Sequence, residues 1–308
     1  MTTEYLTTRE LATLLRIKER KVYDLAASGA VPCSKAMGKL LFPRAEVEAW
    51  LAAGQPRPDL RKQQRNGRSN PPQAALPNVM LGSHDPLLEW ALRESGSGLA
   101  AYFDGSGDGL RRFADGEGLA AGLHLFDPTD QSWNVNVATE RFGSSPAVLV
   151  EWAKRQRGLI IGRSVDREIG GLADLRGQRG LPGLRFAARQ AEAGAQQLFD
   201  ALADQAGLCK ADIQETAVLR SETDAALAVL EDKADASFGL QSLAVQYQLA
   251  FVPIIEERYD LLVDRRSWFE PPMQILMNFC ASEAFKERAS ELEGYDIEGL
   301  GRVHFNGP

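Results

Sequence analysis

Cysteine is scarce in this sequence of 308 residues, and the few cysteines present exclude two kinds of site. Cys33, Cys209 and Cys280 lie far apart and are odd in number. Such a set suggests neither a disulfide framework nor a zinc site. We therefore expect a cytoplasmic protein with reduced thiols.

Leader-like segments and long apolar runs are also missing. The first residues, MTTEYLTTRE, lack the basic-then-apolar order of a signal peptide. No uncharged apolar run approaches the roughly 20 residues that span a bilayer. The sequence therefore predicts no membrane partner.

Motifs that carry catalysis are equally absent. None of the three histidines, His84, His124 and His304, has a Cys or Ser neighbour in a recognised nucleophile motif. No phosphate-loop signature and no metal-ligand spacing appears. We expect a protein that is not an enzyme and that holds no cofactor.

The charge is distributed unevenly along the chain. Residues 1–54 carry a net charge of +2, residues 55–78 a net charge of +4, and the remainder −13, which together give −7. A basic N-terminal part on an acidic body indicates that only the N-terminal part meets a polyanion.

Residues 1–54, the head, show two helix signals and a hairpin. Thr7 precedes Glu10 at the spacing of a capping box, and Leu11, Leu14 and Leu15 follow at helical spacing. A second helix over "KERKVYDLAASGAVP" has Val22 and Leu25 on its inner face, and basic residues crowd its first turn, where they oppose the helix dipole. "CSKAMGKLLFP" predicts a hairpin with its tip at 37–39, and a helix is expected after it.

This order resembles a winged helix-turn-helix of the excisionase and MerR type, over about 50 residues with the pattern T-x-x-E-L-A…V-Y…G-x-V-P…G-x-x-x-F. The resemblance implies a second helix that enters the major groove of double-stranded DNA and a wing that touches the backbone. The alternative is a small protein-interaction domain with a solvated basic face. The implied DNA-binding residues are Lys18, Arg20, Lys21, Tyr23, Gly38 and Lys39.

Residues 55–78 combine Pro, Gly, Asn, Gln and Arg with few apolar side chains. Such a segment cannot bury enough surface to fold alone, so it is expected to be a flexible basic linker. Its basic residues could also contact the duplex without sequence preference.

In residues 79–308 short apolar runs alternate with amphipathic segments, which indicates an α/β fold. The strands expected include 147–153 and 158–162 as two separate strands, and likewise 249–255 and 259–264. A short helix is expected at 171–175 and one long helix at 272–292.

The order "VMLGSHDP", "GLHLFDP", "ERYDL" closely resembles the periplasmic-binding-protein-like domain, related to molybdate-binding proteins, that follows a helix-turn-helix in some bacterial regulators. The resemblance covers nearly all of residues 79–308. It implies two α/β lobes joined by crossing strands, with the ligand between them. Lobe 1 is expected at about 79–156 and 253–308, and lobe 2 at about 157–252.

Strand-to-helix turns of lobe 1 supply the first candidate ligand residues, because helix N-termini present free N–H groups to an anion. Ser83 and His84 occupy one such turn, and Ser106 occupies another that could also be an ordinary loop. Asp85, directly before Pro86, is expected to be an N-cap rather than a ligand contact. The candidate His124 could equally be a core histidine.

Lobe 2 and the returning strand supply the remaining candidates: Arg189, Gln190, Gly239 and Tyr259. Tyr259 could instead be a core residue. Related domains usually carry small hydroxyl residues and an Arg where this chain has Ala193-Gly194-Ala195-Gln196, so a plain copy of an oxyanion pocket is not expected.

Together these features predict a ligand-responsive transcriptional regulator that binds an operator as a homodimer and senses a small anion. Molybdate, tungstate and a small carboxylate all remain open as ligands. Two other functions remain open. One is an intracellular binding or delivery protein for a small anion or a molybdenum-type cofactor, and the other is a recombination-directionality factor.

Overall fold

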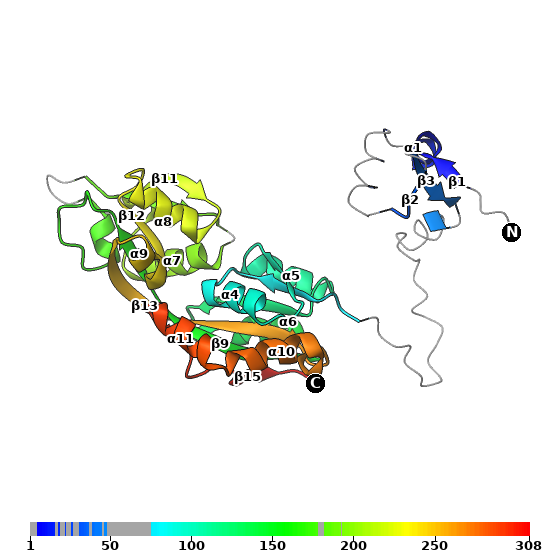
Figure 1. Cartoon of the computed structure of the whole chain (residues 1–308). Helices are drawn as coiled ribbons and strands as arrows, with labels where there is room; N and C mark the ends of the chain where they lie inside the picture. Colours follow the sequence, from blue (N-terminus) through cyan, green and yellow to red (C-terminus); the bar gives the residue numbers. More distant parts are fainter. Residues whose placement is uncertain are drawn as a thin grey trace. The chain divides into compact units, whose positions relative to one another are not determined.

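The computed structural model divides the chain into two compact units, Met1–Gln73 and Ala74–Pro308 (Figure 1). Each unit has an apolar core of its own. The structure describes residues 5–15, 18, 22, 26, 31–36, 39–44, 46–47, 75–177, 182–191 and 193–308.

The head unit contains a small antiparallel sheet and a helix. The sheet has the order β1-β3-β2, and β2 and β3 form the expected hairpin. Its described elements are β1 (Tyr5–Thr7), α1 (Thr8–Leu15), β2 (Ser34–Ala36) and β3 (Lys39–Pro43). The strand β1 is only three residues long, so its sequence, YLT, is too short to show the alternation of apolar and polar residues that predicts a strand.

The capping box at the start of α1 is confirmed. The backbone N–H of Thr7 donates to Oε2 of Glu10 at 2.8 Å, and the N–H of Glu10 donates to Oγ1 of Thr7 at 3.3 Å. Leu11 is fully buried in the head core, but Leu14, expected on the same face, is 46% exposed. The buried face of α1 therefore includes fewer of its leucines than their helical spacing indicates.

The body, Ala74–Pro308, begins with a run of alternating strands and helices that forms most of lobe 1. These elements are β4 (Val79–Gly82), α4 (Pro86–Glu94), β5 (Ala100–Phe103), α5 (Ser106–Ala114), β6 (Ala120–Leu123), β7 (Phe126–Asp127), β8 (Ser132–Trp133), α6 (Val135–Phe142) and β9 (Ala147–Ile161). Sequence reasoning missed α6, whose first turn is rich in β-branched valines.

Lobe 2 and the return to lobe 1 follow. The elements are η1 (Leu172–Leu175), β10 (Arg185–Arg189), α7 (Gly194–Gln205), η2 (Lys210–Asp212), β11 (Gln214–Leu219), α8 (Glu222–Leu230), β12 (Ala236–Leu240), α9 (Gln241–Gln246), β13 (Ala250–Asp264), η3 (Ser267–Phe269), α10 (Pro271–Cys280), α11 (Glu283–Glu291), β14 (Tyr295–Asp296) and β15 (Val303–Asn306). The helix expected at 171–175 is a 3₁₀ turn, and the long helix expected at 272–292 breaks at Ala281–Ser282 into α10 and α11 because Ser282 caps the second helix.

A ten-stranded sheet of order β11-β10-β12-β9-β13-β6-β4-β5 runs through both lobes, with β14 and β15 also paired to β9. The strands β9 and β13 are antiparallel partners over most of their 15 residues and pass from one lobe to the other (Figure 1). The expectation of two short strands in each of these stretches was therefore wrong. Arg155 and Arg157 interrupt the apolar pattern of β9 but are themselves buried, so the strand continues through them.

The lobes have separate cores at opposite ends of the crossing strands. In lobe 1, α4, α10 and α11 pack on one face of the sheet around Trp152 and Phe285, and α5 and α6 pack on the other around Leu149. In lobe 2, one core surrounds Phe186 and Phe199. Within the described residues, no helix is both long enough and apolar enough to cross a membrane.

Candidate ligand-binding cleft

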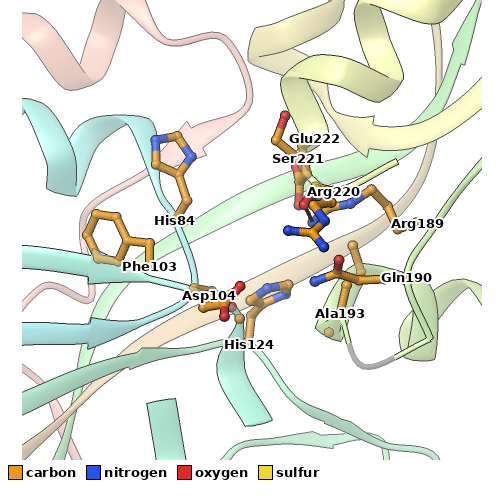
Figure 2. Close-up of a pocket in the computed structure, with 14 residues that line it drawn as sticks. His84, Phe103, Asp104, His124, Arg189, Gln190, Ala193, Arg220, Ser221 and Glu222 are labelled. Carbon is orange, nitrogen blue, oxygen red and sulfur yellow. Dashed lines mark hydrogen bonds and ion pairs between the residues drawn. The ribbon is translucent and has the colours of Figure 1, made fainter. Parts of the chain in front are cut away.

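A cavity of about 110 Å³ lies between the two lobes of the body. It is far smaller than the roughly 300–1,000 Å³ of sites that enclose drug-sized molecules, so it suits a small ligand. Figure 2 shows lobe 1 residues on one side and lobe 2 residues on the other. The lining residues are Ser83, His84, Phe103, Asp104, Gly105, His124, Arg189, Gln190, Ala193, Gly194, Ala195, Arg220, Ser221 and Glu222.

Four strand-to-helix junctions build most of this wall, and they lead into α4, α5, α7 and α8. The first backbone N–H groups of a helix have no acceptor within the helix, and the helix dipole is positive at that end. At α5 and α7 the N-cap residues, Gly105 and Ala193, provide no capping side chain. The cavity therefore concentrates backbone donors that suit an anion.

Two buried serines anchor the lobe 1 wall. The hydroxyls of Ser83 and Ser106 lie 2.8 Å apart, and the backbone N–H of His124 donates to Oγ of Ser106 at 3.2 Å. The carbonyl of Ser83 accepts a hydrogen bond from the hydroxyl of Tyr259. These bonds fix the junctions before α4 and α5 against the end of β6.

His124 is held by one ring nitrogen and turns the other toward lobe 2. Its Nδ1 lies 2.9 Å from Oε2 of Glu257, and because a carboxylate only accepts, Nδ1 carries the hydrogen. A Cβ on Gly194 would lie 3.2 Å from Nε2, which places that nitrogen against the first residue of α7. Nε2 is thus available to a ligand between the lobes.

Arginines dominate the lobe 2 wall. Arg189 is held by backbone carbonyls, since its Nε donates to Leu219 at 3.2 Å and its Nη2 to Arg220 at 2.7 Å. Burial lowers the pKa of Arg189, and the charge of Glu222 opposes that shift. The guanidinium of Arg220 makes no hydrogen bond or ion pair with any described residue, so it can pair with a ligand.

Glu222, the first residue of α8, places a carboxylate in the same wall. Its Oε1 accepts from Nη2 of Arg157 at 2.9 Å, and its Oε2 is buried with no partner among the described residues. Burial would raise the pKa of Glu222, but the charges of Arg157 and Arg189 outweigh it and lower the pKa. The cavity therefore holds an ionised acceptor beside its donors.

Comparison with known proteins places both parts of the chain. A model of the PBP superfamily domain matches residues 88–281, and a model of a helix-turn-helix domain matches residues 5–55. The chain belongs to the PBP superfamily. Residues 74–308 are called the PBP domain below.

One similar protein covers nearly the whole chain, and a solved structure covers the PBP domain. The uncharacterized protein YvgK of Bacillus subtilis (strain 168) is 24% identical over 314 residues, which cover 96% of each protein. A putative phosphate ABC transporter substrate-binding protein from Clostridium perfringens, solved with bound phosphate, is 11% identical. It covers 72% of this chain and 98% of its own, with a TM-score of 0.52. The two family models and this solved structure confirm the predicted fold, a helix-turn-helix followed by a two-lobed PBP domain.

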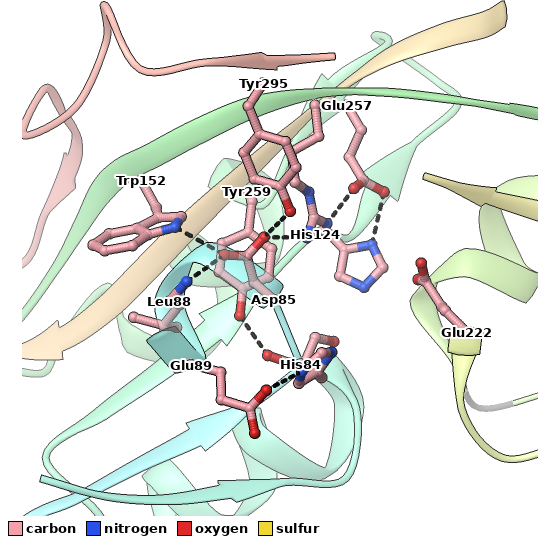
Figure 3. Close-up of polar contacts among 12 residues, drawn as sticks. His84, Asp85, Leu88, Glu89, His124, Trp152, Glu222, Glu257, Tyr259 and Tyr295 are labelled. Atoms are coloured by element: carbon pink, nitrogen blue, oxygen red, sulfur yellow. Dashed lines mark hydrogen bonds and ion pairs between the residues drawn. The ribbon is translucent and has the colours of Figure 1, made fainter. Parts of the chain in front are cut away.

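Behind the cavity of the PBP domain, the buried side chains of Asp85, Arg155, Glu257 and Arg157 join the partly buried Glu222 of the cavity wall in what we call the hinge network. Figure 3 shows Asp85, Glu257 and Glu222 of this network. Arg155 donates to Asp85 at 2.8 Å and to Glu257, and Arg157 donates from Nε to Glu257 at 2.7 Å. The network connects α4 of lobe 1 to α8 of lobe 2 through the two crossing strands.

Asp85 is the N-cap of α4, as expected. Its Oδ1 accepts from the N–H of Leu88 at 2.7 Å and from Nε1 of Trp152 at 3.1 Å, and its Oδ2 accepts from the hydroxyl of Tyr295 at 2.7 Å. The side chain is fully buried and does not line the cavity. It fixes the first junction rather than contacting a ligand.

The structure brings most of the predicted ligand residues together and leaves others apart. Ser83, His84, His124, Arg189 and Gln190 line the cavity. The remaining predicted residues do not line it: Ser106 lies buried behind Ser83, Gly239 lies inside β12, and Tyr259 is a core residue stacked on His124.

Sequence reasoning missed part of the lobe 2 wall. Arg220 and Ser221 stand between β11 and α8, and Glu222 begins α8. Ser221 caps α8 by accepting from the N–H of Asp224 at 2.9 Å. A polar N-cap residue after an apolar run is the kind of signal that pointed to the first junction, where Asp85 is the N-cap, so this turn could have been found in the same way.

The predicted DNA-binding residues fall largely where the structure gives no description. Arg20, Lys21, Tyr23 and Gly38 lie outside the described residues. Lys18 is exposed, and Lys39 begins β3 at the end of the hairpin.

Proposed function

We propose that this chain is a ligand-responsive transcriptional regulator whose PBP domain senses a small anion in the cytoplasm. The matched helix-turn-helix supports a DNA contact, and the PBP domain supports a small-molecule contact. The observation that carries the proposal is the interlobe cavity, where uncapped helix N-termini from both lobes meet Arg220, whose guanidinium has no partner among the described residues.

The ligand we propose is a compact oxyanion, of the class of molybdate, tungstate or phosphate, or a small carboxylate. Helix N-termini of both lobes and Arg220 offer donors from several directions, which suits an anion with oxygens on every side. The solved relative from Clostridium perfringens holds phosphate in the same kind of fold. Among the described residues, neither Ser83 nor Ser221 of the cavity wall has a histidine or a carboxylate on its hydroxyl to activate it as a nucleophile, which favours binding over catalysis.

For the DNA contact we propose a homodimer of the MerR type, with Arg20 and Lys21 in the major groove of an operator. A single short recognition helix reads few base pairs, so specific binding needs two heads. We propose that the PBP domain carries the dimer contact, and that ligand-driven closure of its lobes changes the geometry of the two heads.

Substituting Arg20 and Lys21 together by Ala tests the proposal in the full chain. Gel shifts on the DNA flanking its own gene should show a salt-sensitive complex with the wild type and none with the variant. The thermal shift produced by a binding anion should be the same in both proteins. An intracellular delivery protein would keep the thermal shift while the wild type showed no specific DNA complex. Sedimentation of the full chain as a monomer at all concentrations would contradict the dimer.

A further inference from the structure

His124 turns toward the cavity a ring nitrogen that cannot donate a hydrogen bond while the ring is neutral. Its Nδ1 carries the hydrogen, because Nδ1 lies 2.9 Å from a carboxylate oxygen of Glu257 (Figure 3). The other nitrogen, Nε2, is then an acceptor, and it lies against Gly194, where a Cβ would be 3.2 Å away. Figure 2 shows the ring facing lobe 2 across the cavity. An anion without a hydrogen of its own also offers only acceptors, so its contact with His124 requires a hydrogen on Nε2.

The charged groups around His124 balance one another when no ligand is bound. They are four arginines and four carboxylates: Arg155, Arg157, Asp85, Glu257 and Glu222 in the hinge network, and Arg189, Arg220 and Asp104 in the rest of the cavity wall. Tyr259, stacked on the ring with the centroids 6.0 Å apart, stays uncharged because burial raises the pKa of its hydroxyl well above its ordinary value. His84, the other histidine of the wall, lies 3.0 Å from Glu89 in an exposed pair that water screens.

A proton on Nε2 therefore adds a positive charge that no neighbouring group compensates in the ligand-free protein. His124 is only 4% exposed, and burying an uncompensated charge is costly. Glu257, its nearest carboxylate, already accepts hydrogen bonds from both Arg155 and Arg157. An anion between the lobes supplies the missing negative charge, so the anion and the proton each favour the binding of the other.

We propose that the cleft binds its anion together with one proton, which His124 takes up from the solvent at Nε2. This inference rests on the proposed function and adds the proton to it. In the complex the imidazolium donates from Nδ1 to Glu257 and from Nε2 to an oxygen of the anion, while Arg220 and the helix N-termini hold the other oxygens. The anion itself can be fully deprotonated, because His124 supplies the hydrogen.

Proton uptake makes the affinity for an anion depend on pH with a fixed sign. The complex holds one proton more than the free protein and the free anion, so the binding constant should rise as the pH falls. One proton taken up amounts to at most about 10-fold in affinity per pH unit. A neutral His124 that only packed beside the ligand would give no such slope for an anion that does not itself titrate.

Nuclear magnetic resonance of the histidine ring nitrogens measures the protonation of His124 directly in the full chain. The chain has three histidines, His84, His124 and His304, so isotope-labelled histidine gives few signals, and those lost in His124→Gln belong to His124. At about pH 7.5 we expect Nε2 to be bare without ligand and both ring nitrogens to be protonated with saturating phosphate. His304, which pairs with Glu151 at 2.7 Å and does not line the cavity, should not change.

Two results would overturn the inference: an Nε2 that stays bare in the complex, or one that carries a hydrogen before phosphate is added. Either leaves the anion sensor intact, because isothermal calorimetry of the same samples shows the binding itself. Sulfate, molybdate or acetate replaces phosphate as the probe if phosphate gives no heat. No heat from any of these anions overturns the proposed function as well.

Calorimetry at several pH values separates His124 from the other titrating groups. In His124→Gln the amide can still donate to Glu257 but cannot take up a proton, so its affinity should depend less on pH than that of the wild type, by up to about 10-fold per pH unit. The titration of the anion is the same for both proteins and cancels in the comparison. His304→Gln is the matched control and should keep the wild-type slope.

Equal slopes in the wild type and in His124→Gln overturn the role of His124. If that variant does not fold or does not bind, the ring-nitrogen signals of the wild type decide alone. The signals of His124 are then those that both His84→Gln and His304→Gln retain.

Discussion

Replacing Glu257 by Gln should destabilise the PBP domain far more than its position in one strand indicates. Glu257 is fully buried and receives donors from Arg155, Arg157 and His124. The amide removes the charge that neutralises two buried guanidinium groups and points an NH₂ at donors. Removing one partner of a buried ion pair costs about 3–5 kcal/mol. At about 2–4 °C per kcal/mol for a domain of this size, Tm should fall by about 6–20 °C.

The neighbouring Glu256 provides the control for this change. It is on the same strand but its side chain is 56% exposed, and it pairs with Lys154 at 2.9 Å. An exposed pair contributes at most about 1 kcal/mol, so Glu256→Gln should be close to wild type. Urea unfolding of the full chain, followed by tryptophan fluorescence, measures both, since Trp152 lies buried in the core that touches the hinge network.

The effect of Glu257→Gln should also depend on pH. Burial would raise the pKa of Glu257, but the charges of Arg155 and Arg157 lower it well below its ordinary value of 4.5. Its stabilisation is therefore complete above that value and is lost as the pH falls through the folded pKa. The gap between wild type and variant should be full at pH 7 and shrink in acid. A difference in unfolding free energy under about 1 kcal/mol at pH 7, or one that grows in acid, would show that Glu257 does not neutralise the two buried arginines.

Three further substitutions test the cleft and the sheet. Gly194→Ala places a Cβ 3.0 Å from Cε1 of His124 and should weaken phosphate binding about 10-fold. The control Gly107→Ala, whose Cβ meets nothing within 4 Å, should bind phosphate like the wild type. Equal affinities of the two variants for phosphate in calorimetry would contradict this prediction. His124→Phe removes Nε2 and should lower phosphate affinity by at least about 10-fold; an unchanged Kd would exclude the contact. Gly82 has φ +98°, and a Cβ there would lie 2.2 Å from the carbonyl oxygen of Gly122. Gly82→Ala should therefore lower the free energy of unfolding in urea by about 2–5 kcal/mol, and an unchanged urea midpoint would contradict this close packing.

The parts of the fold that follow local rules could be predicted from the sequence. The capping box of Thr7 and Glu10 and the N-cap role of Asp85 depend on residues three apart, and both are found. The hairpin of β2 and β3 follows from its turn and apolar flanks. These features need no knowledge of distant residues.

The crossing strands could not be predicted in the same way. In "WAKRQRGL" the charged residues read as an interruption, because a charged side chain is rarely buried unless it is paired. Arg155 and Arg157 are buried because Glu257, about 100 residues away, and Asp85 pair with them. Only the tertiary fold brings those carboxylates to β9.

The candidate site was predicted in part in each lobe: Arg189 and Gln190 of lobe 2 line the cavity, but Arg220, Ser221 and Glu222 were missed. Ser83, His84 and His124 stand beside recognisable turns, and all line the cavity. Tyr259 and Gly239 do not, since a strand residue faces the cleft or the core according to its register, which the sequence pattern does not fix. Neither does the pattern show that the two strand-to-helix junctions of lobe 2 meet those of lobe 1.

We expect an anion bound in the cleft to change DNA binding by the head. Fluorescence anisotropy of the full chain on a labelled duplex from the DNA flanking its own gene, titrated with phosphate, tests it most directly. We predict a change in DNA affinity of about 5-fold or more, with a midpoint at the Kd for phosphate found by calorimetry. His124→Phe should move that midpoint upward together with its own Kd. Phosphate that binds the protein but leaves its DNA affinity unchanged would contradict the claim.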